Sequence, residues 1–503
     1  MPRDVPAPHA PHCVVVGAGF GGLAAAARAR ALGFRTTLLD RLPEPGGRAR
    51  VLRQGKFAWD AGPTVITAPG LLAELFALFG ERMEDHVALL PVRPWYRIRF
   101  ADGRCFDHGG TAEEARAAVA AFAPDDVAGY ERLMTQAKRL FETGFERYGA
   151  APFHRPGAMM RALPALLRLG GYRSVSSLVR RHIRDEALAR ALSLQPLLVG
   201  GHPYSTPALY ALILHLERLW GVWFPRGGTG ALVAALTGLL QRHGVAWLPD
   251  RHVERIAVRN GRAAGVRLAD GTTIDADAVI ANADAAEVHA TLLPADAPRV
   301  ATARVDRMRY SFGLYVLCFG TDRTYPGVAH HTILLGRRWR ALLDEVFGRG
   351  SALPDDPSLY LHRPAATDPA MAPAGCDAFY ALVPVPNLRA GIDWAEAAPR
   401  LRLAVLRMLE ERELPGLRSH IVAERSLAPP DFRRDYASRH GAGFSVAPTL
   451  LQSAWFRFHN RAPLPGLYLT GAGTHPGAGV PGVLTSAKLV EGLLRDDYAG
   501  ALP

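Results

Sequence analysis

At the start of the chain the hydrophobic pattern changes from strand to helix and back to strand. Residues 13–16 form a short apolar, β-branched run that stops at glycine, which predicts a buried β-strand. An alanine-rich stretch with helical periodicity follows to about Leu32, and Gly33 ends it. Residues 36–39 predict a second buried strand that closes on Asp40. Strand, helix and strand in immediate succession form the repeating unit of a parallel sheet.

The hydrophobic pattern also divides the rest of the chain. Residues 71–224 are mostly helical in pattern, with a short β-like insertion at 96–106. Beyond residue 224 the pattern predicts a helix to Leu240, a strand at 310–319 and a last helix to about Arg495. Shorter strands are predicted at 247–248, 253–258, 264–268 and 278–281. Together these elements predict an α/β fold with a Rossmann-type domain and a second, mixed α+β domain.

The turn between the first strand and helix carries a G-x-G-x-x-G motif made of Gly17, Gly19 and Gly22, with Phe20 inside it. Gly17 permits the tight turn, Gly19 lets the backbone approach a pyrophosphate, and Gly22 lets helix and strand pack closely. The helix N-terminus offers free N–H groups and a partial positive charge to the phosphates. Asp40 follows Gly17 by 23 residues, the expected spacing for a carboxylate that accepts ribose hydroxyls. Because this charge disfavours a 2′-phosphate, the motif predicts FAD or NAD rather than NADP.

The composition indicates a large globular protein with an anionic partner. Its 503 residues predict two or three domains, and 49% hydrophobic against 21% charged residues excludes a disordered chain. Lys+Arg 59 against Asp+Glu 47 gives a net charge of +12. No helix-turn-helix, zinc or RNA-binding signature accompanies this charge, so we expect no nucleic acid. An anionic membrane surface is the alternative partner.

Several features are expected to be absent. The four cysteines show no C-x-x-C spacing, so we expect buried thiols and neither a disulfide scaffold nor a metal site. The apolar run near the N-terminus imitates a signal peptide, but it carries the nucleotide-loop glycines and is expected to be retained. The best candidate for a membrane span, residues 208–224, is interrupted by His215, Glu217 and Arg218. No transmembrane segment is therefore predicted.

A second glycine-rich segment follows the second predicted strand. Gly46, Gly47 and Arg48 offer another close backbone approach and a guanidinium able to bind phosphate or a flavin carbonyl. The sequence D-A-G-P-T at 60–64, which contains Gly62, forms a further turn. With these segments the chain resembles the superfamily of FAD-dependent amine oxidases and carotenoid desaturases. That family typically has G-G-R after its second strand and a D-x-G segment beside the flavin.

A third glycine-rich loop lies near the other end of the chain. Residues 466–482 contain Gly473 and Val480 and join a predicted strand to the last helix, which makes a second anion-binding N-terminus. One nucleotide bound from both chain ends implies a large, extended cofactor and a discontinuous domain. The pair of loops therefore makes FAD the predicted cofactor. The resemblance adds that the backbone of Val253 holds the adenine.

Over its whole length the chain resembles the carotenoid desaturases, and the bacterial phytoene desaturases in particular. The most specific segments are WDAGPTVIT, LLVGGHPYSTPALYALILHLERLWGVWFPRGGTGALV, FSVAPTLLQSAWFRFHNR and GLYLTGAGTHPGAGVPGVLTSAK. The resemblance implies an FAD enzyme that desaturates phytoene in several steps, toward lycopene or neurosporene, by hydride transfer to flavin N5. Since phytoene has no heteroatom, we expect orientation and the cofactor to carry the reaction, without a metal. A membrane quinone or oxygen is the expected electron acceptor.

Residues 150–190 interleave leucine and methionine with arginine, an amphipathic pattern that fits a membrane surface. Because phytoene lies in the bilayer, the resemblance implies a cytoplasmic protein associated peripherally with the inner membrane. We expect an FAD-binding domain formed by residues 1–75, 225–300 and 450–503. A substrate-binding domain is expected at 76–110 and 301–449, and a helical membrane-associating region at 111–224.

The resemblance points to one polar residue near the reacting carbons, Arg161, in a helix that reads PFHRPGAMMRALP here. Relatives have an acidic residue nearby where this chain has Ala158, so the expected acid–base pair is incomplete. Several histidines are expected to titrate near neutral pH, and none is assigned to catalysis. These are His202, His215, His330, His331 and His475.

Three alternatives remain open at this point. A desaturase for a hydroxylated or methoxylated carotenoid, or for C30 diapophytoene, would share these motifs. A non-catalytic isoprenoid-binding protein on the same fold, as in Rab escort proteins and GDP-dissociation inhibitors, would have lost the flavin-binding features that are intact here. A soluble amine oxidase would place a lysine beside the flavin, and Lys56, Lys138 and Lys488 do not stand in such a context.

Overall fold

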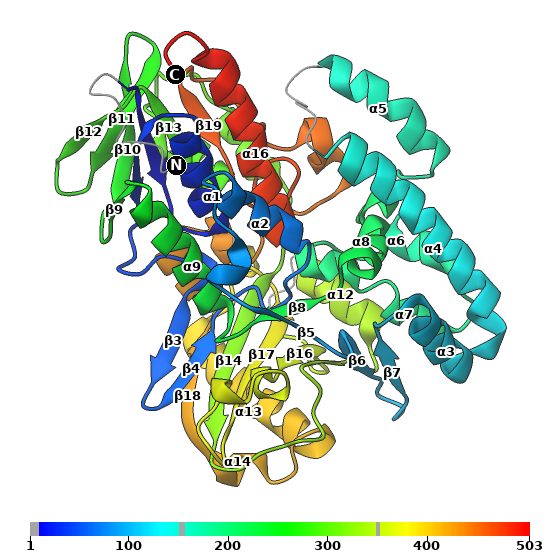
Figure 1. The fold of residues 1–503 in the computed structure, drawn as a ribbon. Coiled ribbons are helices and arrows are strands. Elements are labelled where there is room, and N and C mark those ends of the chain that lie inside the picture. The colour runs from blue at the N-terminus through cyan, green and yellow to red at the C-terminus, as the bar shows by residue number, and fades with distance from the viewer. Residues whose placement is uncertain (1–9, 150–155, 349–352, 503) are drawn as a thin grey trace.

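The computed structural model describes residues 10–149, 156–348 and 353–502. It combines a five-stranded sheet, a seven-stranded sheet and a group of helices (Figure 1). In Figure 1 the five-stranded sheet lies at the upper left with both chain ends, the seven-stranded sheet lies below it, and the helices lie at the right.

The five-stranded sheet is the nucleotide sheet, and all its strand pairs are parallel, in the order β19-β13-β1-β2-β9. Its strands are β1 (His12–Val16), β2 (Arg35–Leu39), β9 (Ala246–Leu248), β13 (Ala278–Ala281) and β19 (Leu467–Leu469). The continuous apolar run of β1 is buried along its whole length, as expected for a parallel strand covered on both faces.

Helices cover one face of the nucleotide sheet and a small antiparallel sheet covers the other. The helices are α1 (Phe20–Ala31), α2 (Pro69–Ala77), α9 (Thr229–Arg242) and α16 (Val480–Asp497). The small sheet consists of β10 (Val253–Arg259), β11 (Arg262–Leu268) and β12 (Thr273–Asp275). Because β13 pairs with β1 and β19 pairs with β13, chain segments more than 250 residues apart form one domain.

The seven-stranded sheet has the order β18-β14-β17-β16-β15-β6-β7 and is mainly antiparallel, with one parallel pair between β15 and β6. Its strands are β6 (Tyr96–Arg99), β7 (Cys105–His108), β14 (Gly313–Thr321), β15 (His331–Leu334), β16 (Leu359–His362), β17 (Asp377–Val385) and β18 (Ile421–Leu427). On one face it packs against α13 (Trp394–Arg412) and α14 (Leu417–His420). On the other face lie α12 (Trp339–Phe347), α15 (Pro429–Tyr436) and the hairpin β3 (Val51–Gln54)–β4 (Phe57–Asp60).

The helical region contains α3 (Ala112–Phe122), α4 (Val127–Phe141), α5 (Pro156–Arg168), α6 (Val175–Arg180), α7 (Glu186–Ala191) and α8 (Leu212–Trp220). Two short strands, β5 (Leu89–Pro91) and β8 (Trp223–Pro225), pair at its border with the nucleotide domain. The remaining short helices include α10 (Ala285–Glu287) and α11 (Thr302–Arg307). Within the described residues, every helix is too short or too polar to cross a bilayer.

Single-turn 3₁₀ and π segments connect these elements. The 3₁₀ segments are Gly47–Ala49, Met83–Asp85, Pro124–Asp126, Gln195–Val199, Ala208–Ala211, Pro364–Ala366, Pro369–Met371, Leu388–Ala390, Arg439–Gly441, Leu450–Gln452 and Ala454–Phe456. The π segments are Glu142–Arg147 and Val288–Leu292.

The structure differs from the sequence predictions in three places. The long strand begins at Gly313 rather than 310, because Tyr310 forms an isolated bridge with Val446 instead of continuing the ladder. The hairpin at 51–60, expected in the nucleotide domain, packs into the core of the seven-stranded sheet, where Trp59 Nε1 donates to the carbonyl of Phe319 (3.2 Å). Cys105 is exposed on β7, whereas the other three cysteines are buried as expected.

Candidate active site

A cavity of 1010 Å³ extends from the nucleotide sheet into the helical region. Its nucleotide end is lined by the loops that follow β1, β2 and β13 and by the loop before α16. The other end is lined by apolar side chains of α8, α12, the seven-stranded sheet and the segment at 194–213. Residues of this apolar end include Leu197, Leu198, Leu209, Leu212, Ile213, Leu216, Ile333, Leu335, Leu342, Leu343 and Val346.

The first glycine loop meets the geometric demands of a nucleotide turn. Gly17 has φ +97°, and a Cβ placed on Gly22 would lie 1.8 Å from the Gly17 carbonyl oxygen, so neither position admits a larger residue without movement of the backbone. Gly17, Gly19 and Phe20 line the cavity, whereas Gly22 lies behind the turn and acts by packing. Gly19 is the N-cap of α1 and supplies no side-chain cap, which leaves N–H groups of the first turn available to an anion.

Asp40 stands at the cavity wall just after β2. Its Oδ2 accepts the N–H of Ala18 (2.7 Å) and its Oδ1 accepts the N–H of Leu42 (2.9 Å). These bonds tie the glycine loop to the end of β2, and each oxygen retains a second lone pair. Burial raises the pKa of Asp40, and the two backbone hydrogen bonds oppose that rise. The position suits a ribose hydroxyl, as the sequence predicts.

The G-G-R segment and the turn at 60–64 approach each other at the centre of the site. A Cβ on Gly62 would lie 1.9 Å from the carbonyl oxygen of Arg48, so this contact requires glycine. Gly47, Arg48 and Gly62 line the cavity, but Asp60 does not. Asp60 instead accepts the N–H groups of Thr229 (2.7 Å) and Gly230 (2.9 Å) and caps α9.

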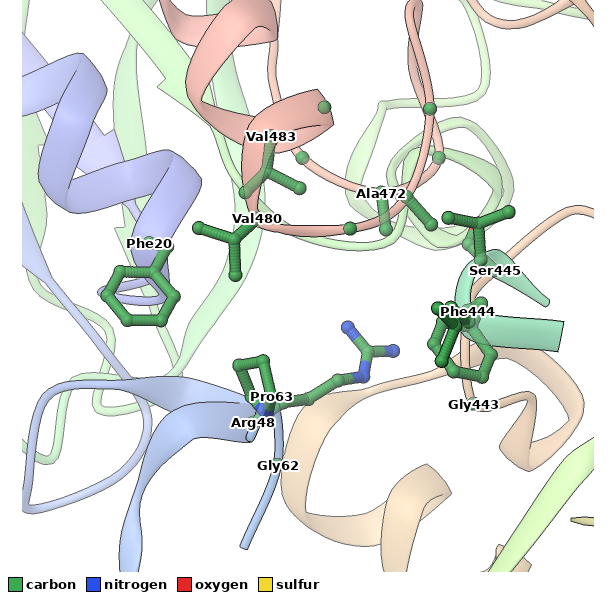
Figure 2. Close-up of a pocket in the computed structure, with 18 of the residues that line it drawn as sticks. Phe20, Arg48, Gly62, Pro63, Gly443, Phe444, Ser445, Ala472, Val480 and Val483 are labelled. Atoms are coloured by element: carbon green, nitrogen blue, oxygen red, sulfur yellow. The ribbon is translucent and has the colours of Figure 1, made fainter. Parts of the chain in front are cut away.

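Figure 2 shows the Arg48 side chain extending across the pocket between Pro63 and Phe444. Its Nη2 donates to Ser438 Oγ (3.2 Å), while its Nε is buried without a hydrogen-bond partner. Burial lowers the pKa of Arg48, and the nearby carboxylate of Asp284 opposes that shift. A buried guanidinium with an unused donor is costly, so the site fits a ligand that brings acceptor oxygens.

The C-terminal loop closes the cavity from the opposite side. Gly473 and Val480 line it, and Figure 2 shows Val480 facing Phe20 across the pocket. Gly479 has φ +92° and is the N-cap of α16, again without a side-chain cap. Val253, at the start of β10, also lines the cavity near Asp40.

Arg457, to which the sequence analysis gives no role, fixes the conformation of this C-terminal loop. It is 1% exposed, and its guanidinium donates to the carbonyls of Ala472 (2.6 Å), Thr474 (3.0 Å), Val446 (3.2 Å) and Gln452 (3.3 Å). One side chain thus organises two separate backbone segments beside the cavity. In the sequence, Arg457 belongs to the FSVAPTLLQSAWFRFHNR segment, one of those that carry the family resemblance.

The structure does not bring Arg161 to the cavity. It lies on the exposed side of α5, and the cavity lining does not include it. Its backbone carbonyl accepts the hydroxyl of Tyr148 (3.1 Å). A catalytic role for Arg161 therefore gains no support from its position.

Burial shifts the pKa values of the five histidines singled out by the sequence downward. Burial lowers the pKa of His330 and His475 to about 3 and that of His331 well below its usual value. Burial also lowers the pKa of His202 and His215. Among the described residues, ligand atoms of His330, His331 and His362 lie within 4.8 Å of one another, a grouping that the sequence does not predict. None of these three lines the cavity.

The nucleotide end of the cavity fits FAD. Glycines at close backbone contacts, two uncapped helix N-termini and the unused donor of Arg48 match the pyrophosphate and ring carbonyls of that cofactor. Residues of the loops at 17–20, 46–48, 62–64 and 471–480 would hold it.

Comparison with known proteins agrees with this site. Residues 20–490 match the family model described as flavin containing amine oxidoreductase. A lycopene-forming phytoene desaturase from Pseudescherichia vulneris is 48% identical, with 96% of this chain and 99% of that protein covered. A second lycopene-forming enzyme, from a Paracoccus strain, is 45% identical over 98% and 99% of the two chains. A neurosporene-forming phytoene desaturase from Rhodobacter capsulatus is 41% identical over 96% and 94%.

Solved structures agree on the fold. An oxidoreductase from Methanosarcina mazei superposes with a TM-score of 0.66 at 19% identity, covering 95% of this chain and 99% of that one. A putrescine oxidase variant gives a TM-score of 0.65 at 14% identity, covering 97% and 99%. The glycine loops, the continuous apolar cavity and these relatives lead to one conclusion: the chain is an FAD-dependent oxidoreductase that belongs to the flavin-containing amine oxidoreductase family and, within it, to the bacterial phytoene desaturases.

Proposed function

We propose that this protein desaturates phytoene in several steps, toward lycopene or neurosporene. The observation that carries the proposal is that one cavity joins an FAD-type nucleotide site to a long apolar chamber. A C40 hydrocarbon binds through burial of apolar surface, and the leucine-rich lining supplies that surface. The relatives at 41–48% identity carry the names of phytoene desaturases of both product types.

The chemistry divides between cofactor and protein. Hydride acceptance is what FAD supplies when it is bound. The chain's own residues orient the polyene against the cavity wall and exclude water from it. The loops at 46–48 and 62–64 stand where the nucleotide end meets the apolar end, so we place the reacting carbons there.

The alternative substrates and the non-catalytic reading find no support. The two lycopene-forming relatives and the neurosporene-forming one cover nearly all of this chain and are named for phytoene. The flavin-binding loops, which a non-catalytic isoprenoid carrier would have lost, line the cavity intact. Phytoene is therefore the substrate proposed here.

The proposed function is tested by anaerobic incubation of the FAD-loaded protein with phytoene in liposomes. The flavin absorption is expected to bleach, and a visible chromophore should accumulate once an acceptor is added. Supplying either a quinone or oxygen identifies the acceptor, and we propose a membrane quinone because substrate and quinone share the bilayer. Stable flavin absorption and unchanged phytoene would refute the proposal.

Access to the substrate is proposed to come from the membrane, through an apolar patch at the mouth of the cavity. Tyr148, Leu166 and Ala454 line the cavity where α5 meets the segment at 454–456. Three large exposed apolar side chains belong to α5, and three belong to the neighbouring 3₁₀ segments at 450–452 and 454–456. They are Met160, Leu163 and Leu167 of α5 with Leu450, Leu451 and Phe456. We call these six residues the entry patch.

The entry patch fits the surface of a bilayer. Arg161 and Arg168 are exposed on α5 beside its apolar side chains, and arginines at that level attract anionic lipid headgroups. The net charge of +12 acts in the same direction. A peripheral position on the cytoplasmic face of the inner membrane is therefore our proposal for its location.

Serine substitution at Leu167 and Leu451, which are 51% and 71% exposed, is expected to weaken binding to anionic liposomes about 30-fold. Each leucine loses roughly 1 kcal/mol of burial in lipid. Liposome co-sedimentation measures the change. The matched control replaces Leu403 and Val422, both 54% exposed on α13 and β18, and is expected to leave binding unchanged. An equal loss of liposome binding in the two double variants would contradict the proposal that the entry patch contacts the membrane.

A further inference from the structure

A buried carboxyl group interrupts the apolar end of the cavity. Glu217 belongs to α8, is 0% exposed and lines the cavity together with Tyr96 and His108. A chamber for a hydrocarbon gains nothing from an ionisable group, because burial of a charge without a partner is strongly unfavourable. Glu217 therefore needs an explanation beyond packing.

The two oxygens of Glu217 have different environments. Its Oε1 accepts a hydrogen bond from the hydroxyl of Tyr96 on β6 (2.7 Å). Its Oε2 is buried and has no hydrogen-bond partner. The neighbouring cation, Arg218, is directed elsewhere and donates to the hydroxyl of Tyr130 (2.7 Å). One oxygen is thus fixed in orientation, while the other is buried and keeps an unused acceptor.

Among Glu217 and the titratable side chains around it, Glu217 is the group whose charge changes near neutral pH. Burial raises its pKa to about 7, and the hydrogen bond from Tyr96 opposes the rise. Burial lowers the pKa of His108 to about 4 and that of His331 well below its usual value, so both imidazoles are neutral. Burial raises the pKa values of Tyr96 and Tyr360, so both phenols stay protonated.

The Glu217 cluster is connected to the turn that borders the nucleotide end. Tyr96 and His331 are adjacent, with ring centroids 5.8 Å apart. His331 Nδ1 bonds to the Tyr360 hydroxyl (2.5 Å), which bonds to Thr64 Oγ1 (2.7 Å). Thr64 belongs to the D-A-G-P-T turn and lines the cavity next to Gly62 and Pro63. The carboxyl group is therefore connected, through His331 and Tyr360, to the turn beside the proposed reaction centre.

We propose that Glu217 accepts the proton lost from the substrate in each desaturation step, with Tyr96 as the residue that positions it. This inference rests on the proposed function. It also fills the place left open by Arg161, which lies outside the cavity.

Each desaturation removes a hydride and a proton from adjacent carbons of the substrate. With FAD bound, one allylic C–H bond would break and its hydride, with both electrons, would go to the cofactor, leaving the substrate as a carbocation conjugated with the polyene. The adjacent C–H bond then breaks, its electron pair forms the new C=C bond, and its proton goes to Oε2 of Glu217. An unactivated C–H is far too weak an acid for a carboxylate, but a C–H beside a cation is strongly acidic, so this order suits a carboxyl group. Release of the proton to water restores the carboxylate for the next step.

The test compares wild type, Glu217→Gln and Tyr96→Phe as FAD-loaded proteins with phytoene liposomes across a range of pH. For the wild type the desaturation rate is expected to rise with pH through about 7, because the carboxylate is the active form. Glu217→Gln is expected to lower the rate about 100-fold or more and to remove this dependence. Tyr96→Phe removes the hydrogen bond that favours the carboxylate form of Glu217. The increase of its desaturation rate with pH is therefore expected at higher pH than in the wild type.

Two further measurements keep a folding defect separate from a chemical one. Flavin content and melting temperature are expected to match wild type in Glu217→Gln. Infrared difference spectra between acid and neutral pH should show a buried carboxylic acid band in the wild type that is missing in this variant. The control is Glu413→Gln, which removes a mostly buried carboxyl paired with Arg99 (2.9 Å) outside the cavity and should retain the wild-type pH profile.

The outcomes separate the two hypotheses. A wild-type protein that neither bleaches nor converts phytoene overturns the proposed function and this inference together. A Glu217→Gln protein that remains within a few-fold of an active wild type, with the same pH profile, overturns the inference alone. An infrared carboxylic acid band that is unchanged in Glu217→Gln also overturns the inference alone.

Discussion

Replacing Gly22 with alanine is expected to abolish FAD binding. The new Cβ would lie 1.8 Å from the carbonyl oxygen of Gly17 and 3.0 Å from its carbon, and both atoms belong to the turn that must hold the pyrophosphate. Overpacking a side chain alone costs roughly 1–3 kcal/mol. Because backbone atoms must move here, we expect more than about 3 kcal/mol, or over ~100-fold in the FAD dissociation constant. Flavin absorbance per polypeptide and FAD titration measure the loss.

The control for Gly22 makes the same change in a helix with space for it. Gly492 lies within α16, and a Cβ there meets nothing within 4 Å. Alanine at that position is expected to stabilise the protein by up to about 1 kcal/mol and to leave its FAD content unchanged. Full flavin loading of the Gly22 variant would contradict the packing role given to this glycine.

Replacing Arg457 with methionine is expected to destabilise the whole nucleotide domain. Methionine has a similar length but no donor, so four backbone carbonyls lose their hydrogen bonds. A hydrogen bond to a charged group contributes roughly 1.5–3 kcal/mol, and a domain has about 5–15 kcal/mol in total. We expect a loss of roughly 5 kcal/mol together with loss of FAD, because the carbonyls of Ala472 and Thr474 belong to the C-terminal loop.

Urea denaturation and flavin content measure the effect of the Arg457 substitution. The matched control is Arg495→Met, at an arginine that is 65% exposed and pairs with Glu491 on the surface of α16. That pair is expected to contribute less than about 1 kcal/mol. A stable, FAD-loaded Arg457→Met protein would show that the loop keeps its conformation without this guanidinium.

The nucleotide site was predictable from the sequence because its signals are local. A glycine needed for a tight turn, a buried strand and an acid at fixed spacing all follow one another within 30 residues, and the structure has them at β1, α1 and β2. The C-terminal loop was predictable for the same reason, as strand, glycines and helix in succession. The roles of the individual residues toward FAD stay predictions.

The chemistry of the apolar end was not predictable in this way, because its partners are distant in the chain. Tyr96 and Glu217 are separated by 121 residues and meet only when β6 packs against α8. The sequence pattern showed Glu217 only as one of the polar residues that interrupt an apolar run. The exposed position of Arg161 was not predictable either, since a local motif cannot tell which face of its helix is exposed.

The order of strands in the nucleotide sheet has a consequence for how the protein is made. Synthesis produces β1 and β2 first, but β19 and α16, which complete the sheet and the cofactor site, follow every other strand by dozens of residues. A domain whose segments are far apart in the chain cannot complete its fold until the last of them has been synthesised. The seven-stranded sheet, whose strands all lie between residues 96 and 427, is complete earlier. We therefore expect the capture of FAD to be a late event in the maturation of the protein, after the strands of the other sheet have all been synthesised.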